Sequence, residues 1–206
     1  GNFLMFFNNK TRFKKYLLSI LIGLPTWYVI GILVAFSNNF AEKFGVDENV
    51  LPKKSTMFAY AAISIADVLI GFVSHWLRSR KKALYIFYVI TLAGIALFFS
   101  QANNSAERMY AICALLGFGT GFWAIFVTMA AEQFGTNLRA TAATTVPNMV
   151  RGALPLLLLF FNGLQNTFSY VNAALITGIT VMVISFFAAI FSEETFGKDL
   201  NYIETN

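Results

Sequence analysis

Two ionisable residues lie inside long apolar stretches of this sequence and are the first candidates for chemistry. Asp67 falls within the apolar run 57–76, and Arg151 falls within the run 141–162. A charged side chain at the centre of a bilayer costs roughly 2.5–3.5 kcal/mol even on the mildest insertion scale. Such groups usually face a polar cavity, an opposite charge or a solute on its path. Asp67 and Arg151 are therefore candidate substrate or coupling residues, and a structural ion pair between them is the alternative.

Polar residues accompany each of these two charges at helical spacing. Tyr60 and Ser64 precede the aspartate, and Thr144 and Asn148 precede the arginine, at intervals of three or four residues. This spacing places each set on one face of a helix. We expect all four to line a cavity shared by the two helices. Helix–helix contacts within the membrane are the alternative for the threonine and the asparagine.

Two tryptophans complete the candidate site. Trp27 lies beside Pro25, which removes a backbone donor and is expected to kink its helix. Trp123 follows the G-x-x-x-G pattern of Gly117 and Gly121, which predicts close helix packing. Aromatic residues make up 17% of this chain, so ordinary packing is the alternative reading for both tryptophans.

The composition is that of an integral membrane protein. Hydrophobic residues make up 57% of the chain and charged residues 12%, whereas a soluble domain carries about 25% charged residues. The basic residues cluster beside apolar segments, so the net charge of +5 predicts membrane orientation and no nucleic-acid partner. With one histidine and one cysteine, the chain offers poor metal sites. We expect no metal and no cofactor.

The apolar blocks are long enough to cross a bilayer, which takes about 20 residues per helix. They predict an all-α bundle of six transmembrane helices, at 16–36, 57–76, 83–101, 108–126 (continuing to 131), 141–162 and 168–191. The predicted organisation is a segment 1–15 before the bundle, the bundle itself at 16–191 and a tail at 192–206. The third and sixth helices lack a dense polar stripe and are expected to be supports.

Basic residues set the orientation. They concentrate in the segment before the first helix and in the loop after the second, as Lys10, Arg12, Lys14, Lys15, Arg78, Arg80, Lys81 and Lys82. On the opposite side acidic residues dilute the lysines. The positive-inside bias therefore predicts that both termini are cytoplasmic.

Six charged residues then fall at cytoplasmic helix ends and form a candidate gating network, in which ion pairs would form when that side is closed. They are Arg78, Arg80, Glu132, Arg139, Glu193 and Glu194. Simple solvation of these charges at the interface is the alternative.

Four segments of the chain resemble motifs of the major facilitator superfamily. The junction 71–82 is similar to the G-x-L-A-D-R-x-G-R-R loop, with His75 at the position of the aspartate. Residues 131–141 resemble A-E-x-F-P-T-x-x-R-A-T, and the stretch 144–155 resembles N-x-x-R-x-G-x-x-x-P. The tail 193–198 resembles P-E-T-K-G, with Glu193 in place of the proline.

The resemblance to sugar- and metabolite-type members implies that these six helices are the C-terminal half of a twelve-helix transporter. It implies alternating access around a central site lined by the first, second, fourth and fifth helices of this chain. The partner would be the N-terminal six-helix half of the same transporter, and the absence of an initial methionine agrees with a larger parent. Low charge, abundant phenylalanine and asparagine, and short loops favour a bacterial inner membrane.

We therefore expect a secondary active transporter, not an enzyme, that moves a small polar solute such as a sugar or a carboxylate. The carboxylate of Asp67, well inside its predicted span, favours proton coupling. An intramembrane enzyme is one alternative, but the sequence lacks convergent nucleophile–base or metal-ligand sets. A non-transporting six-helix membrane subunit, or a six-helix protein that pairs with itself, is the other.

Overall fold

The computed structural model describes residues 2–46 and 49–204, which contain helices and no strand. The elements are η1 (Phe3–Phe6, a 3-10 turn), α1 (Lys10–Tyr28), η2 (Val29–Val34, a π-helix), α2 (Ser37–Lys43), α3 (Pro52–Leu77), α4 (Arg80–Phe99), α5 (Ala106–Thr120), α6 (Trp123–Glu132), α7 (Thr136–Gly152), α8 (Leu154–Leu164) and α9 (Tyr170–Phe191).

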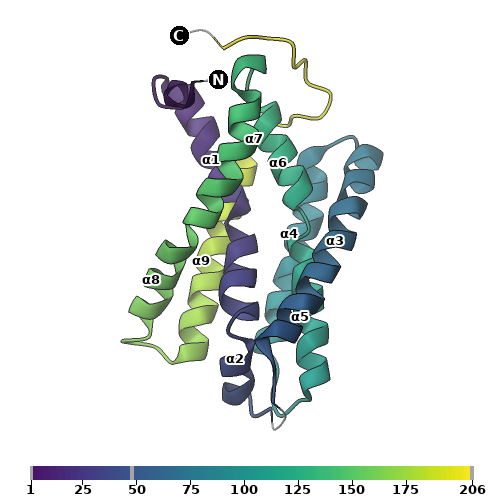
Figure 1. The fold of residues 1–206 in the computed structure, drawn as a ribbon, viewed down its shortest axis with the longest axis vertical. Coiled ribbons are helices and arrows are strands. Elements are labelled where there is room, and N and C mark those ends of the chain that lie inside the picture. Colours follow the sequence, from purple (N-terminus) through teal and green to yellow (C-terminus); the bar gives the residue numbers. More distant parts are fainter. Residues whose placement is uncertain (1, 47–48, 205–206) are drawn as a thin grey trace.

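Within the described residues these elements make six segments that are long and apolar enough to cross a membrane. The segments are 10–34, 52–77, 80–99, 106–132, 136–164 and 170–191. The prediction of an all-helical, multi-pass membrane protein is therefore confirmed. Figure 1 shows the chain ends N and C at the same end of the bundle, with α2 at the other.

The helices form two groups (Figure 1). In one group α1 packs against α9 and α7, and α8 packs against α9. In the other group α5 packs along α3 and α4. The short helix α6 contacts α7 and α1 on one side and α3 and α4 on the other. It therefore bridges the two groups on the side of the chain ends.

Several helices begin earlier than their apolar content suggests, because polar residues cap them. The side chain of Asn9 accepts hydrogen bonds from the backbone amides of Thr11 and Arg12, so α1 starts at Lys10 and not at Tyr16. The Ser79 side chain accepts one from the amide of Lys82 and opens α4 in the same way. Charged residues that hydropathy alone assigns to loops therefore lie in the first turns of these helices. There the hydrogen bonds of the cap decide where the helix begins.

Three of the predicted continuous spans are interrupted. The first passes Pro25 and then widens into the π-helix η2. The fourth breaks at Gly121 and Phe122, between α5 and α6. The fifth breaks at Ala153, between α7 and α8.

Proline explains the break at Ala153 and also a missing hydrogen bond inside α1. Pro155, in the first turn of α8, has no N–H to continue the hydrogen-bond ladder of α7. Pro25 leaves the carbonyl of Leu21 without its helical donor, and the hydroxyl of Ser185 on α9 donates to that carbonyl instead, at 2.8 Å. A polar residue of the supporting helix α9 therefore supplies the hydrogen bond that α1 lacks at Pro25.

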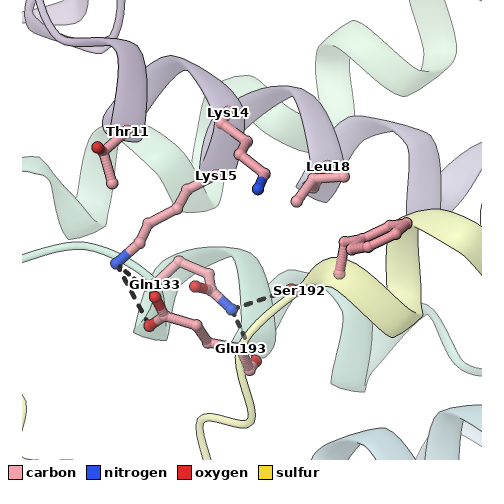
Figure 2. Close-up of a pocket in the computed structure, with 8 residues that line it drawn as sticks. Thr11, Lys14, Lys15, Leu18, Gln133, Ser192 and Glu193 are labelled. Carbon is pink, nitrogen blue, oxygen red and sulfur yellow. Dashed lines mark hydrogen bonds and ion pairs between the residues drawn. The ribbon is translucent and has the colours of Figure 1, made fainter.

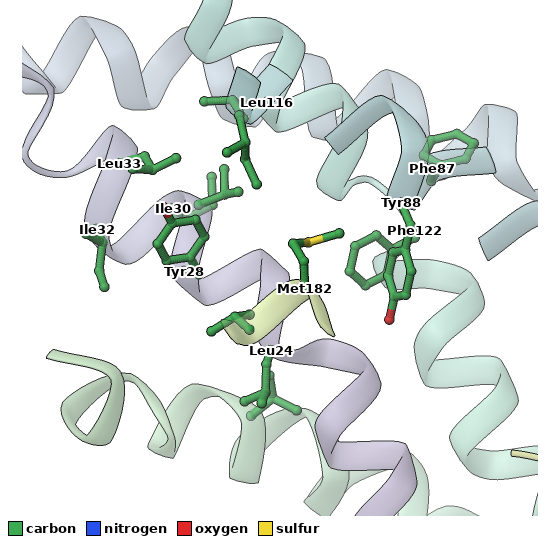
Figure 3. Close-up of a cluster of buried hydrophobic side chains, with 14 of the residues drawn as sticks. Leu24, Tyr28, Ile30, Ile32, Leu33, Phe87, Tyr88, Leu116, Phe122 and Met182 are labelled. Carbon is green, nitrogen blue, oxygen red and sulfur yellow. The ribbon is translucent and has the colours of Figure 1, made fainter. Parts of the chain in front are cut away.

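The apolar interior joins the two helix groups (Figure 3). Tyr28 and Tyr88 are fully buried within it, beside Phe122 and Met182. Their hydroxyls donate to backbone carbonyls of neighbouring helices, Tyr28 to Ala174 at 2.8 Å and Tyr88 to Ile22 at 2.6 Å. Because both of these hydroxyls have an acceptor, the two rings can pack at depth without an unsatisfied polar group.

Glycines allow α5 to lie directly against its neighbours, as the G-x-x-x-G pattern predicts. A methyl group added at Gly117 would clash with the backbone of Ala59, and one at Gly121 would clash with Ala66 on α3. One at Gly119 would lie 2.8 Å from the backbone of Thr91 on α4. The helix therefore has no room for a side chain on either of these faces.

We expect Gly117→Ala to destabilise the bundle by about 1–3 kcal/mol, the usual cost of overpacking, because the obstacle is backbone and cannot rotate away. The matched control is Gly71→Ala on α3, where nothing lies within 4 Å of the added methyl group. Thermal unfolding of the detergent-solubilised protein should show a lower melting temperature for the first variant only. An unchanged melting temperature in Gly117→Ala would contradict this packing.

Candidate functional site

A cavity of about 310 Å³ opens between the two helix groups. Its walls come from α1 and η2, from α3, from the junction of α5 and α6, and from α7. The lining residues are Thr26, Trp27, Ile30, Tyr60, Ile63, Ser64, Asp67, Thr120, Trp123 and Arg151. Neither α4 nor α9 contributes, in agreement with their predicted role as supports.

Asp67 is half-buried near the middle of the 26-residue helix α3. Its Oδ1 accepts a hydrogen bond from the backbone amide of Ala124, with 3.0 Å between the oxygen and the nitrogen. Ala124 lies in the first turn of α6, where amides have no acceptor within their own helix. The carboxylate therefore caps the broken fourth span from a neighbouring helix, and a negative charge is favourable at that end.

Arg151 lies in the last turn of α7, just before the break that Pro155 causes. One guanidinium nitrogen donates to Oδ1 of Asn148 at 2.9 Å, and the guanidinium carbon lies 5.8 Å from the centre of the Trp123 ring. A cation over a tryptophan face is attracted by the ring. These two contacts leave the rest of the exposed guanidinium facing the cavity.

The two charges share this cavity without pairing. Among the residues that the structure describes, Asp67 and Arg151 form no ion pair within 4.0 Å. The alternative of a structural ion pair is therefore absent from this conformation. Each charge is held by other groups, the aspartate by α6 and the arginine by Asn148 and Trp123.

The structure brings most of the predicted site residues together. Trp27, Tyr60, Ser64 and Trp123 line the cavity with the two charges. Asn148 instead orients the arginine from within α7.

Thr144 is exposed on α7 and is not among the residues of this chain that line the cavity. Its hydroxyl donates to the carbonyls of Ala140 and Thr141 in its own helix, as that of Ser64 does to Tyr60. Its role towards a solute stays a prediction.

Sequence reasoning missed Thr26 and Thr120, which both lie in the cavity wall. The hydroxyl of Thr120 donates to carbonyls within α5. Thr26 is only 7% exposed, and its hydroxyl has no hydrogen-bond partner among the described residues. The buried indole N–H of Trp27 has none there either. No sequence signal identifies these unpaired groups, because pairing depends on packing against other helices.

A second polar cluster closes the end of the bundle where both chain ends lie. Arg80, in the first turn of α4, forms an ion pair with Glu132 at the end of α6, at 3.0 Å, and donates to Ser74 at 3.1 Å. Glu132 also accepts a hydrogen bond from the Thr195 hydroxyl at 2.6 Å. The tail, α4 and α6 are thus joined through one carboxylate.

Glu194 of the tail caps α4. Its carboxylate accepts hydrogen bonds from the Ser79 hydroxyl and from the backbone amides of Arg80, at 2.9 Å, and Lys81, at 3.2 Å. Partial burial raises the pKa of this carboxyl, but the Ser79 hydroxyl and the amides of Phe196, Arg80 and Lys81 together lower the pKa below its ordinary value. The ionised form is therefore the one that holds the tail.

Glu193 connects the tail to α1 (Figure 2). It pairs with Lys198 at 2.7 Å and with Lys15 at 3.3 Å. The hydrogen bond from Lys198 lowers its pKa, burial opposes that shift, and Lys15 adds to it. Beside it Gln133 donates to the Ser192 hydroxyl and to the Glu193 carbonyl, which anchors the end of α9.

The remaining two members of the predicted network lie at the same end. The backbone of Arg78 takes the left-handed conformation (φ 48°) and ends α3, while its side chain is exposed. The guanidinium of Arg139 donates to the carbonyl of Leu200 in the tail. Arg80, Glu132 and Glu194 therefore form one connected cluster with the tail, Glu193 and Arg139 hold the tail separately, and Arg78 forms no ion pair within the described residues.

No protein-family model matches this sequence, and no curated protein matches it. The resemblance to the major facilitator superfamily rests on the residues quoted above.

We expect acid to release the tail. Both carboxyl pKa values lie below their ordinary value of 4.5 in the folded protein, so the ionised contacts are fully present above pH 4.5 and are lost as pH falls through the lowered values. Hydrogen–deuterium exchange of residues 192–204, corrected for intrinsic rates at each pH, should rise only below pH 4.5.

Glu194→Gln should raise the same exchange at neutral pH, because a neutral amide caps α4 less well. Glu42→Gln, in α2 at the opposite end of the bundle, is the matched control. Equal protection of the tail in all three proteins would rule out the carboxylate as its anchor.

Proposed function

We propose that this chain is the C-terminal half of a major facilitator-type secondary transporter that moves a small polar solute by alternating access, with proton coupling at Asp67. The observation that carries the proposal is the cavity. Four separate spans place two unpaired opposite charges, aromatic rings and hydroxyls around one opening at membrane depth. Charges kept at such depth generally mark a solute or ion path.

Broken helices support the same reading. Transporter sites typically lie near the midplane, where discontinuous helices direct their ends at the substrate or coupling ion. Here two of the spans that line the cavity break beside it, at Gly121–Phe122 and at Ala153, and a third becomes a π-helix at Val29. Trp123 and Arg151 lie directly at the two breaks.

The open side of the cavity supports a second bundle as partner. Ser64 and Arg151 are exposed, and so are large side chains nearby on α3, among them Tyr60 at 47%. A six-helix bundle alone would present these polar groups to lipid, which is costly. A second six-helix half would cover them and complete the cavity wall.

The charge cluster of Arg80, Glu132 and Glu194 has a place in the proposed cycle. It joins α4, α6 and the tail at the end that the positive-inside bias assigns to the cytoplasm. Such contacts would favour the conformation in which that end is packed shut. The proposed setting is a bacterial inner membrane, with both chain ends in the cytoplasm.

The test is uptake into liposomes by the protein as its gene encodes it, with and without an inward proton gradient, over a panel of labelled sugars and carboxylates. We expect accumulation against the concentration gradient, and at least a tenfold loss of proton-driven accumulation in Asp67→Asn. Gradient-independent exchange should survive in this variant, because the amide resembles the protonated carboxyl in size and charge.

Asp199→Asn in the tail is the matched control and should behave as the unmodified protein. Among the described residues its carboxylate accepts one hydrogen bond, from the nearby amide of Asn201. Unchanged accumulation in Asp67→Asn would remove Asp67 from coupling. Absence of any uptake by demonstrably folded protein would favour a non-transporting membrane subunit.

A further inference from the structure

Three side chains of the cavity wall have hydrogen-bond donors that no described residue accepts. The guanidinium of Arg151 uses one nitrogen on Asn148 and faces the opening with the rest. The indole N–H of Trp27 and the hydroxyl of Thr26 lie in the wall with no partner among the described residues. A buried donor without an acceptor is unfavourable, so a ligand that supplies acceptors would relieve both.

The charged donor distinguishes the ligand classes that this wall could hold. The Asp67 carboxylate accepts from the Ala124 amide. The hydroxyls of Ser64 and Thr120 donate to carbonyls of their own helices, so towards a ligand they act as neutral acceptors. Neutral acceptors serve any polar solute, whereas the free part of the Arg151 guanidinium and the buried Trp27 N–H favour a ligand with an anionic acceptor.

We propose that the solute is a small organic carboxylate anion that binds to Arg151, with Trp27 and Thr26 as further donors, and that Asp67 takes up one proton as the anion enters. This inference rests on the proposed function and names the substrate class of the same site.

Charge balance links the anion to the proton. The titratable groups that line the cavity are Asp67 and Tyr60 on α3 and Arg151 on α7, while α1, η2, α5 and α6 contribute none to the lining. With Asp67 ionised and Arg151 charged, the charges that this chain contributes to the empty cavity cancel. An entering carboxylate would leave one uncompensated negative charge at membrane depth, and one proton on Asp67 removes it.

The cap on α6 gives this exchange a structural basis. The positive end of α6 lies at the cavity and its Ala124 amide is now held by the Asp67 carboxylate. A neutral Asp67 is a weaker acceptor and no longer offsets the positive end of the helix. The carboxylate of the solute would then take over the electrostatic role that Asp67 has in the empty cavity.

The first test is calorimetric binding by the purified protein, as its gene encodes it, in nanodiscs. The probes are three matched pairs, which are gluconate and sorbitol, lactate and lactamide, and benzoate and benzyl alcohol. We expect saturable binding of at least one anion, at least tenfold tighter than its uncharged partner. Tighter or equal binding by the uncharged partners, or no binding by any of the anions, overturns the proposal.

The second test counts protons. Titrations at about pH 7, far above the ordinary carboxyl pKa of about 4, keep the ligand ionised. Repeating them in two buffers of different ionisation enthalpy measures the protons taken up per anion bound. We expect up to one proton for the unmodified protein and none for Asp67→Asn, which should still bind the anion. Equal proton uptake by both proteins overturns the role of Asp67.

Arg151→Gln should weaken anion binding at least tenfold, and Arg151→Lys should restore part of it because the charge remains. The matched control is Arg108→Gln, which should bind the anion normally. Arg108 is exposed and contacts Asn104 in the loop between α4 and α5. Gel filtration and melting temperature verify that each variant is folded. Normal anion binding by folded Arg151→Gln also overturns the proposal.

The outcomes separate this inference from the proposed function. Anion binding with proton uptake, but without uptake into liposomes, supports the carboxylate site and contradicts transport. Uptake of uncharged solutes without any preference for anions supports transport and overturns the carboxylate site.

Discussion

The structure depends most on the requirement that backbone polar groups at membrane depth find partners inside the protein. No water is present in the hydrocarbon core to satisfy them, and each unpaired group costs several kcal/mol. Continuous helices meet the requirement unaided, but the spans around the cavity are interrupted. Interruptions free amides or carbonyls, and at two places in this bundle side chains from other helices take over as partners. Ser185 serves the carbonyl of Leu21, and Asp67 serves the amide of Ala124.

This requirement explains why structural and functional roles coincide at Asp67. A carboxylate is an effective partner for a free helix amide, and it is also the group most easily neutralised by a proton. Arg151 lies at the end of α7 and contacts Asn148 and Trp123, so it too is held by its surroundings. At Asp67 the cavity is thus built from a group that a broken helix needs for its own stability. At the other end, Glu194 caps α4 by the same physics, in contact with water.

Hydropathy and polar spacing predict much of this arrangement, including six spans, the two supporting helices, and a shared cavity for Asp67, Arg151 and both tryptophans. These features follow from local periodicity, which the sequence displays directly. The helix breaks were not predicted, because the turn at Gly121–Phe122 contains no proline and depends on packing against α3. Thr26 was missed for a related reason. Whether a hydroxyl near a cavity has a partner is decided by neighbours far away in the sequence.

The glycines at which α5 touches α3 and α4 make the stiffness of the bundle uneven. At Gly117 and Gly119 the backbone of α5 meets those of α3 and α4 with no side chain between them, so at these points a change of rotamer cannot adjust the contact. Larger side chains fill the interface elsewhere, as where Phe87 stacks on Phe118. The three helices would therefore move together in any large change of shape. The change would fall first on the two-residue turn before α6, beside the amide that Asp67 holds.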